Sequence, residues 1–108
     1  LMKWIYLIIA IITEVIATSA LKESQGFSKL LPSVIVIIGY SLTFYFMSLT
    51  LKEMSVGITY AIWSGMGILL ISLIGYFRYN QVLDSAAIFG MSFIVVGVII
   101  LRFFSKSI

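Results

Sequence analysis

Long apolar runs, separated by charged residues, divide the chain into four similar parts. The runs cover 4–21, 30–51, 54–77 and 85–101. Each approaches the roughly 20 residues that a helix needs to cross a bilayer. Lipid offers the backbone no hydrogen-bond partner, and the runs are too long and uniform for barrel strands. We therefore predict an all-α membrane protein with four transmembrane helices, in which residues 1–108 form one domain.

The connections between the runs are short, at roughly 22–29, 52–53 and 78–84. No connection is large enough to fold as a catalytic or nucleotide-binding domain, and no G-x-x-x-x-G-K phosphate loop is present. We therefore expect a secondary transporter rather than an enzyme, with an ion gradient as its energy source and no cofactor. A signal peptide is a weaker interpretation of the first run, because Glu14 interrupts its apolar core. We expect Met2, which follows Leu1, to be the natural start.

The composition of the chain limits the kinds of partner that it can bind. Hydrophobic residues make up 62% of the chain and charged residues 10%, with a net charge of +3, whereas soluble domains carry roughly 25% charged residues. The chain has no cysteine and no histidine, so we expect no metal site. The basic residues stand singly at the ends of the runs, which indicates contact with a lipid membrane rather than with nucleic acid.

The basic residues barely distinguish the two sides of the membrane. Four spans place both termini and the second connection on one side, with Lys3, Lys52, Arg102 and Lys106. The other side holds Lys22, Lys29 and Arg78. Orientation follows the Lys/Arg bias of short loops, and here that bias nearly vanishes. We therefore predict insertion in both orientations; a single orientation set by other features is the alternative.

Glu14 is the one charged residue inside any of the runs. It lies about ten residues into the first run, near the bilayer midplane at about 1.5 Å per residue. A charge there costs at least roughly 2.5–3.5 kcal/mol and usually marks a transport pathway. The alternative is a neutral Glu14 that only bonds another helix, which the absence of a buried Lys or Arg partner disfavours.

The helical period gives the first run two faces. One stripe contains Leu7, Ala10, Ile11, Glu14, Ala17, Thr18 and Leu21. The opposite stripe, which suits lipid, contains Ile5, Ile8, Ile9, Ile12, Val15 and Ile16. Desolvation disfavours the charged form of a carboxyl group. Glu14 is therefore expected to hold a proton or a cationic ligand in competition, with Ala10, Ala17 and Thr18 beside it.

Aromatic and small side chains share faces in the second and third runs. The third run has Tyr60, Trp63, Ser64 and Gly67 on one face, and the second has Tyr40, Thr43, Phe44 and Met47 at similar spacing. Aromatic faces attract cations, Trp most strongly. We predict that Tyr40, Tyr60 and Trp63, with Thr43, Phe44 and Ser64 beside them, contact a cationic substrate; plain packing is the alternative.

Glycines mark two further positions. Gly65 and Gly67 lie in the middle of the third run, where they suit either a kink that gates the pathway or close helix packing. Gly90 and Gly97 lie seven residues apart on the fourth run, so they share one face, and small residues let helix backbones approach. Because four helices are few to enclose a polar pathway, we predict a homodimer with Gly90 and Gly97 near its contact.

Three segments resemble the small multidrug resistance family: "AIITEVIATSALK" around Glu14, "GFSKLLPS" in the first connection and "GITYAIWSGMG" in the third run. The resemblance covers nearly the whole chain and is strongest to the quaternary-ammonium exporters. It implies an antiparallel, dual-topology homodimer in the inner (plasma) membrane that exchanges protons for organic cations. It also implies the family's essential glutamate at Glu14. The binding aromatics fall on Tyr40, Tyr60 and Trp63, the kink on Gly65–Gly67 and the dimer glycines on Gly90 and Gly97.

Three alternatives remain beside a proton-coupled exporter of lipophilic, aromatic and quaternary ammonium cations. The first is a guanidinium exporter of the same family, against which Ala17 argues because it leaves the Glu14 pocket open. The second is a non-transporting accessory membrane subunit, which would show no proton–cation exchange. The third is a small pore, which the lack of a polar stripe on the other three runs disfavours.

Overall fold

The computed structural model describes residues 1–107, which form four long helices. Their bounds are Met2–Glu23 for α1, Leu30–Thr50 for α2, Val56–Tyr79 for α3 and Ser85–Phe104 for α4. All four are long and apolar enough to cross a membrane, which confirms the predicted all-helical class and the four helices. The chain divides into two compact units, Leu1–Met54 and a second that begins at Ser55. The treatment of 1–108 as one domain stays a prediction.

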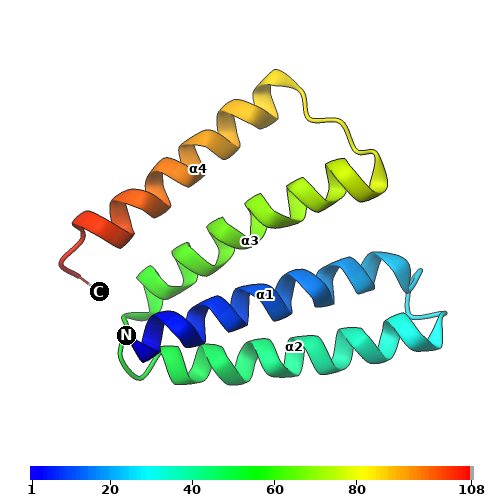
Figure 1. Ribbon diagram of the computed structural model, residues 1–108, viewed down its shortest axis with the longest axis horizontal. Helices are drawn as coiled ribbons and strands as arrows, with labels where there is room; N and C mark the ends of the chain where they lie inside the picture. Colours follow the sequence, from blue (N-terminus) through cyan, green and yellow to red (C-terminus); the bar gives the residue numbers. More distant parts are fainter. Residues whose placement is uncertain (108) are drawn as a thin grey trace. The chain divides into compact units, whose positions relative to one another are not determined.

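The first unit is an antiparallel hairpin in which α1 and α2 lie side by side (Figure 1). Its closest approach is at Gly39 of α2, where a Cβ atom would lie 2.7 Å from the Cβ of Ala17 and 3.4 Å from the carbonyl oxygen of Thr13. Helices in lipid associate through such small residues, which let the backbones approach closely, because burying an apolar side chain against another helix gains no hydrophobic free energy over contact with lipid tails. Gly39 therefore sets the distance between α1 and α2.

A tight turn closes the hairpin. Gln25, Gly26 and Phe27 adopt left-handed backbone conformations in succession, with φ of 48°, 72° and 65°. Ser24, which is fully buried, organises this turn. Its hydroxyl donates to the carbonyl of Leu21 at 2.7 Å and accepts from the backbone N–H of Phe27 at 3.1 Å. Local hydrogen bonds thus satisfy backbone groups that the end of α1 leaves open.

The second unit contains α3 and α4, joined by a capped connection. Asn80 ends α3 in the left-handed conformation, and the N–H of Gln81 donates to the carbonyl of Gly75 at 3.0 Å, so a backbone hydrogen bond closes the end of the helix. Asp84 begins α4, where its carboxylate accepts from the N–H of Ala87 at 2.8 Å, as N-cap residues do. These caps fix where each helix ends.

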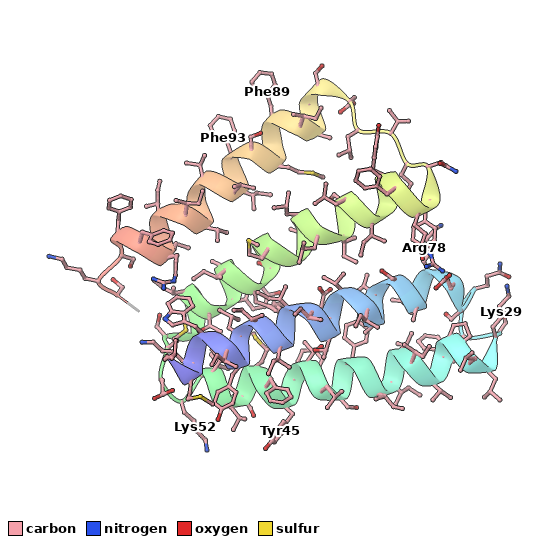
Figure 2. All side chains as sticks on the ribbon, in the orientation of Figure 1. Lys29, Tyr45, Lys52, Arg78, Phe89 and Phe93 are labelled. Carbon is pink, nitrogen blue, oxygen red and sulfur yellow. The ribbon has the colours of Figure 1, made fainter. Side chains whose placement is uncertain are left out.

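The α3–α4 contact is sparse. A Cβ atom at Gly65 of α3 would lie 2.7 Å from a methyl carbon of Val98 and 3.1 Å from one of Ile94, so α4 crosses α3 at Gly65. None of the residues of α4, all of which lie in the described part of the chain, is buried. Phe89 and Phe93 are 69% and 76% exposed and point away from α3 (Figure 2).

One expectation for the faces of α1 is wrong. Val15 was expected among the lipid-facing residues but is buried, with 7% of its surface exposed, whereas Leu21 on the opposite stripe is 36% exposed. Ile8, Ile12 and Ile16 are more than half exposed, as the lipid-facing stripe predicts. The reason is that the buried arc of α1 is wider than one stripe, and an apolar residue suits protein and lipid equally.

Candidate functional site

The Glu14 carboxyl group stands at the end of a chain of hydroxyl groups. Its Oε1 accepts a hydrogen bond from the hydroxyl of Thr18 at 2.8 Å, one turn further along α1. The Thr18 oxygen lies 2.5 Å from the hydroxyl of Tyr40 on α2. Thr18 has a single hydroxyl proton, which it gives to Glu14, so Tyr40 donates the second bond. Thr18 and Tyr40 therefore hold one oxygen of the carboxyl group.

The other oxygen of Glu14 is not held. Its Oε2 is buried and has no hydrogen-bond partner within residues 1–107. A buried acceptor without a partner costs roughly 1–3 kcal/mol, and more when it carries charge. A proton on this oxygen removes its negative charge, and a cation beside it balances that charge, so either one lowers the cost. The two oxygens thus have different chemistry: Oε1 is fixed by the protein and Oε2 is available to a ligand.

Aromatic surface adjoins this carboxyl group on α2. The rings of Tyr40 and Phe44 stack one turn apart, with centroids at 6.3 Å and an interplanar angle of 20°. Tyr40 is half-buried, and Phe44 is 59% exposed. The predicted contact set of Glu14, Thr18, Tyr40 and Phe44 is therefore gathered along one edge of the α1–α2 hairpin.

Three residues predicted to contact substrate are fully buried. Ala10, Ala17 and Thr43 are each 0% exposed. Ala17 contacts Gly39, and the hydroxyl of Thr43 donates to the carbonyl of Gly39 at 2.9 Å. Contact of these three side chains with a substrate stays a prediction.

Thr13 was not predicted, although it lies beside Glu14 in the sequence. Its hydroxyl oxygen is 2.8 Å from that of Thr43, and it can also donate to the carbonyl of Ile9 at 2.9 Å. A threonine in an apolar helix commonly bonds its own backbone one turn earlier, so the sequence carried no signal for a partner on α2. That partner becomes apparent only with the register of α1 against α2.

The second unit carries the other aromatic pair. Tyr60 and Trp63 of α3 meet edge to face, with centroids at 5.4 Å and an interplanar angle of 69°. Tyr60 is 60% exposed. The indole Nε1 of Trp63 is buried and finds no acceptor among the residues described. Buried indole groups usually have a hydrogen-bond partner, so this donor stands out among the described residues.

Ser64 and Gly65 of α3 and Gly97 of α4 line a groove between the two helices. The groove has a volume of about 290 Å³, and its lining comprises Ala61, Ser64, Gly65, Ile68, Ile94, Gly97, Val98 and Leu101. The Ser64 hydroxyl donates to the carbonyl of Tyr60 at 2.8 Å. The helix α3 is continuous through Gly65 and Gly67. At Gly65 the packing alternative is supported; a gating role for Gly65 and Gly67 stays a prediction.

Two glycines of α4, Gly90 and Gly97, have free space where a side chain would stand. A Cβ atom at Gly90 or Gly97 would meet no atom within 4 Å. Their place in a homodimer stays a prediction. The same holds for a single site that unites Glu14 and Tyr40 of the first unit with Tyr60 and Trp63 of the second, since each pair is described within its own unit.

Comparison with known proteins adds independent findings. The family model described as Small Multidrug Resistance protein matches residues 2–94. A quaternary ammonium compound-resistance protein, QacE of Escherichia coli, is 53% identical over 104 residues, which cover 96% of this chain and 94% of the relative. A putative ethidium bromide resistance protein of Escherichia coli is 50% identical over 99 residues, 92% of this chain and 86% of the relative. A multidrug transporter of Pseudomonas aeruginosa is 47% identical over 105 residues, which cover 97% of this chain and 96% of the relative.

Proposed function

The chain belongs to the Small Multidrug Resistance protein family, and on that premise we propose that it exports lipophilic aromatic and quaternary ammonium cations in exchange for protons. The observation that carries the proposal is the buried, unpartnered Oε2 of Glu14. A proton or an organic cation at this oxygen relieves the same unsatisfied group. The two ligands therefore compete, and competition for one site is the basis of exchange.

The aromatic surfaces support organic cations as the competing ligand. A quaternary ammonium group has no N–H to donate, so its attraction to a site is electrostatic and apolar. Tyr40 and Phe44 stack beside Glu14, and Tyr60 and Trp63 form a second aromatic pair. Aromatic faces bind such cations with about 0.5–2 kcal/mol each, more when water is excluded. The names of the relatives, which refer to quaternary ammonium compounds and ethidium, agree with this substrate class.

Exchange across a membrane also needs a site that opens to each side in turn. We propose that two copies assemble as an antiparallel homodimer in the inner membrane, with the two Glu14 groups sharing one cavity and no cofactor. The near balance of Lys and Arg between the two sides supports insertion in both orientations. Figure 2 shows Lys29, Lys52 and Arg78 near helix ends, where they suit the membrane surface. The proton gradient then drives the cation outward.

Proton release on binding tests this function. Adding ethidium to the purified protein in weakly buffered detergent should release protons, because the cation displaces them from Glu14. Glu14→Gln keeps the shape but removes the titratable group, so it should abolish both proton release and uphill transport in proteoliposomes. Glu14→Asp should retain exchange with an altered pH profile. Glu53→Gln, at an exposed position, is the matched control.

Two outcomes would contradict the proposal. One is ethidium binding without proton release at every pH tested. The other is uphill transport by Glu14→Gln. A protein that binds and exchanges no cation would instead support a non-transporting accessory subunit. Guanidinium in the same assay distinguishes the two exporter classes of the family.

A further inference from the structure

The Thr13–Thr43 pair forms a polar contact between α1 and α2 that the proposed function does not use. The two hydroxyl oxygens lie 2.8 Å apart. Two further contacts join the helices further along α1: Ala17 lies against Gly39, and Thr18 bonds Tyr40. The Thr13–Thr43 and Ala17–Gly39 contacts follow one antiparallel register. Tyr40 lies between Gly39 and Thr43 along α2, and Glu14 lies between Thr13 and Thr18 along α1. We call the Thr13–Thr43 contact the threonine bridge.

The hydrogen bonds of the threonine bridge are complete without any ligand. Each hydroxyl has one proton and accepts through lone pairs. When Thr43 donates to Thr13, Thr13 donates to the carbonyl of Ile9 at 2.9 Å. When Thr13 donates to Thr43, Thr43 donates to the carbonyl of Gly39 at 2.9 Å. Thr43 is 0% exposed, and in either arrangement the bridge has no spare proton for a substrate.

The position of the threonine bridge gives it an indirect role. Tyr40 precedes Thr43 by three residues, so the two lie about 60° apart around α2, at 3.6 residues per turn. Fixing Thr43 against Thr13 therefore fixes the rotation of α2 and the height at which the Tyr40 hydroxyl meets Thr18. That bond is 2.5 Å long and needs close placement, because hydrogen bonds weaken steeply when misaligned.

We propose that Thr13 and Thr43 are positioning residues, which set the affinity of the site for organic cations by holding Tyr40 on Thr18 and, through Thr18, the Oε1 of Glu14. This inference rests on the proposed function, because it concerns the same carboxyl group. It differs from a general stabilising role in one respect: the effect of the threonine bridge on affinity passes through the Tyr40 hydroxyl.

A double-mutant cycle on ethidium affinity tests that route. Thr43→Val removes the hydroxyl at nearly constant volume, and Thr13 keeps the carbonyl of Ile9 as acceptor. We expect about fivefold weaker binding, the scale of one net hydrogen bond. In a Tyr40→Phe background the same substitution should change affinity by less than about twofold, the limit of additivity. Thr43→Ser should restore affinity, and Ser41→Ala on the exposed face of α2 is the control.

Two results would overturn the proposal. One is an unchanged affinity in Thr43→Val. The other is the same fold-change in both backgrounds, which would make the bridge merely structural. Infrared spectra of the Glu14 carboxyl stretch in lipid, without any cation, give a second measurement. Thr43→Val should shift this band in the direction that Tyr40→Phe does, and an unshifted band contradicts the proposal. Because this measurement needs no transport, it separates failure of the bridge from failure of the proposed exchange.

Discussion

The α1–α2 pair and the α3–α4 pair are both antiparallel helix pairs of similar length, but they are held in different ways. Between α1 and α2, a glycine–alanine contact is flanked by two hydroxyl–hydroxyl contacts. Between α3 and α4, the contact centres on Gly65 and two aliphatic side chains. In lipid, apolar surface alone gives helices little reason to associate. The first pair therefore has a defined register, whereas the second leaves α4 with a large surface for lipid or for another chain.

This difference assigns the two pairs different tasks. The hairpin presents Glu14, Thr18 and Tyr40 as one preorganised group, and preorganised groups bind without a cost of reorganisation. The second unit contributes an aromatic pair at Tyr60 and Trp63 and an exposed α4. Substitutions in the two pairs should accordingly differ in kind as well as in size.

The largest effect should come from Gly39→Val, which breaks the α1–α2 contact. The new Cβ would lie 2.7 Å from the Cβ of Ala17 and 3.3 Å from its Cα, so backbone must move. We expect a loss of about 3 kcal/mol in the free energy of unfolding, the upper range for overpacked sites, measured by reversible unfolding in mixed micelles. Gly57→Val, where a Cβ would meet nothing within 4 Å, is the control. Equal losses in the two variants would contradict the contact.

Trp63→Ala should weaken ethidium binding by about 2 kcal/mol, the scale of a desolvated cation–π contact, while unfolding changes less than in Gly39→Val. A fluorescence titration measures this. Trp63→Phe should recover part of the affinity because it keeps an aromatic face. Tyr45→Leu is the control, since Tyr45 is 58% exposed on the side of α2 away from α1 (Figure 2). Unchanged affinity in Trp63→Ala would assign Trp63 to packing.

Gly65→Ala should lower the free energy of unfolding by about 1 kcal/mol. The loss should be smaller than in Gly39→Val, because the new methyl meets only the side-chain methyl groups of Val98 and Ile94 and no backbone. Val98→Ala in the same chain should restore stability by making room. Thermal unfolding of the single and double variants measures both. If Val98→Ala adds a further loss instead of a recovery, the α3–α4 crossing is not at Gly65.

The smallest effect should come from Gly97→Ala. Nothing lies within 4 Å of the added methyl in the protomer, and alanine favours a helix over glycine, so unfolding should not become easier. If Gly97 lies at a dimer contact, the methyl separates the two backbones, and we expect dimer affinity to fall about threefold. Förster transfer between labelled copies in lipid measures it. Unchanged dimerisation would place the contact on another face of α4.

The elements of the fold were predictable because charges mark the ends of the apolar runs. Lys22 and Arg78 lie in the last turns of α1 and α3, close to the predicted ends at 21 and 77. Glu14 was equally accessible, since a lone carboxylate in such a run is costly and therefore conspicuous. These signals concern transfer from water to lipid, which depends on residue type and not on neighbours.

The helix contacts were not predictable for the opposite reason. Val15 and Ile16 are adjacent β-branched residues, yet Val15 is buried and Ile16 is exposed. Residue type does not distinguish them, because lipid and protein interiors are equally apolar. Ala17 and Thr43, which are predicted to contact a substrate, both contact Gly39, and no pattern in the sequence indicated that contact. The difference between a pocket and a helix interface depends on the register of two helices, which no pattern within one helix contains.

The turn at Gln25–Phe27 also bears on how the protein is made. It joins α1 to α2 with few residues, and the entropy lost in closing a loop grows with its length. Ser24 stabilises the turn from within its own segment, and every contact of the threonine bridge comes from the first half of the chain. During synthesis, the hairpin can therefore complete its hydrogen bonds while α3 and α4 are still inside the ribosome. In each newly made copy the Glu14 group would then be assembled by the hairpin alone.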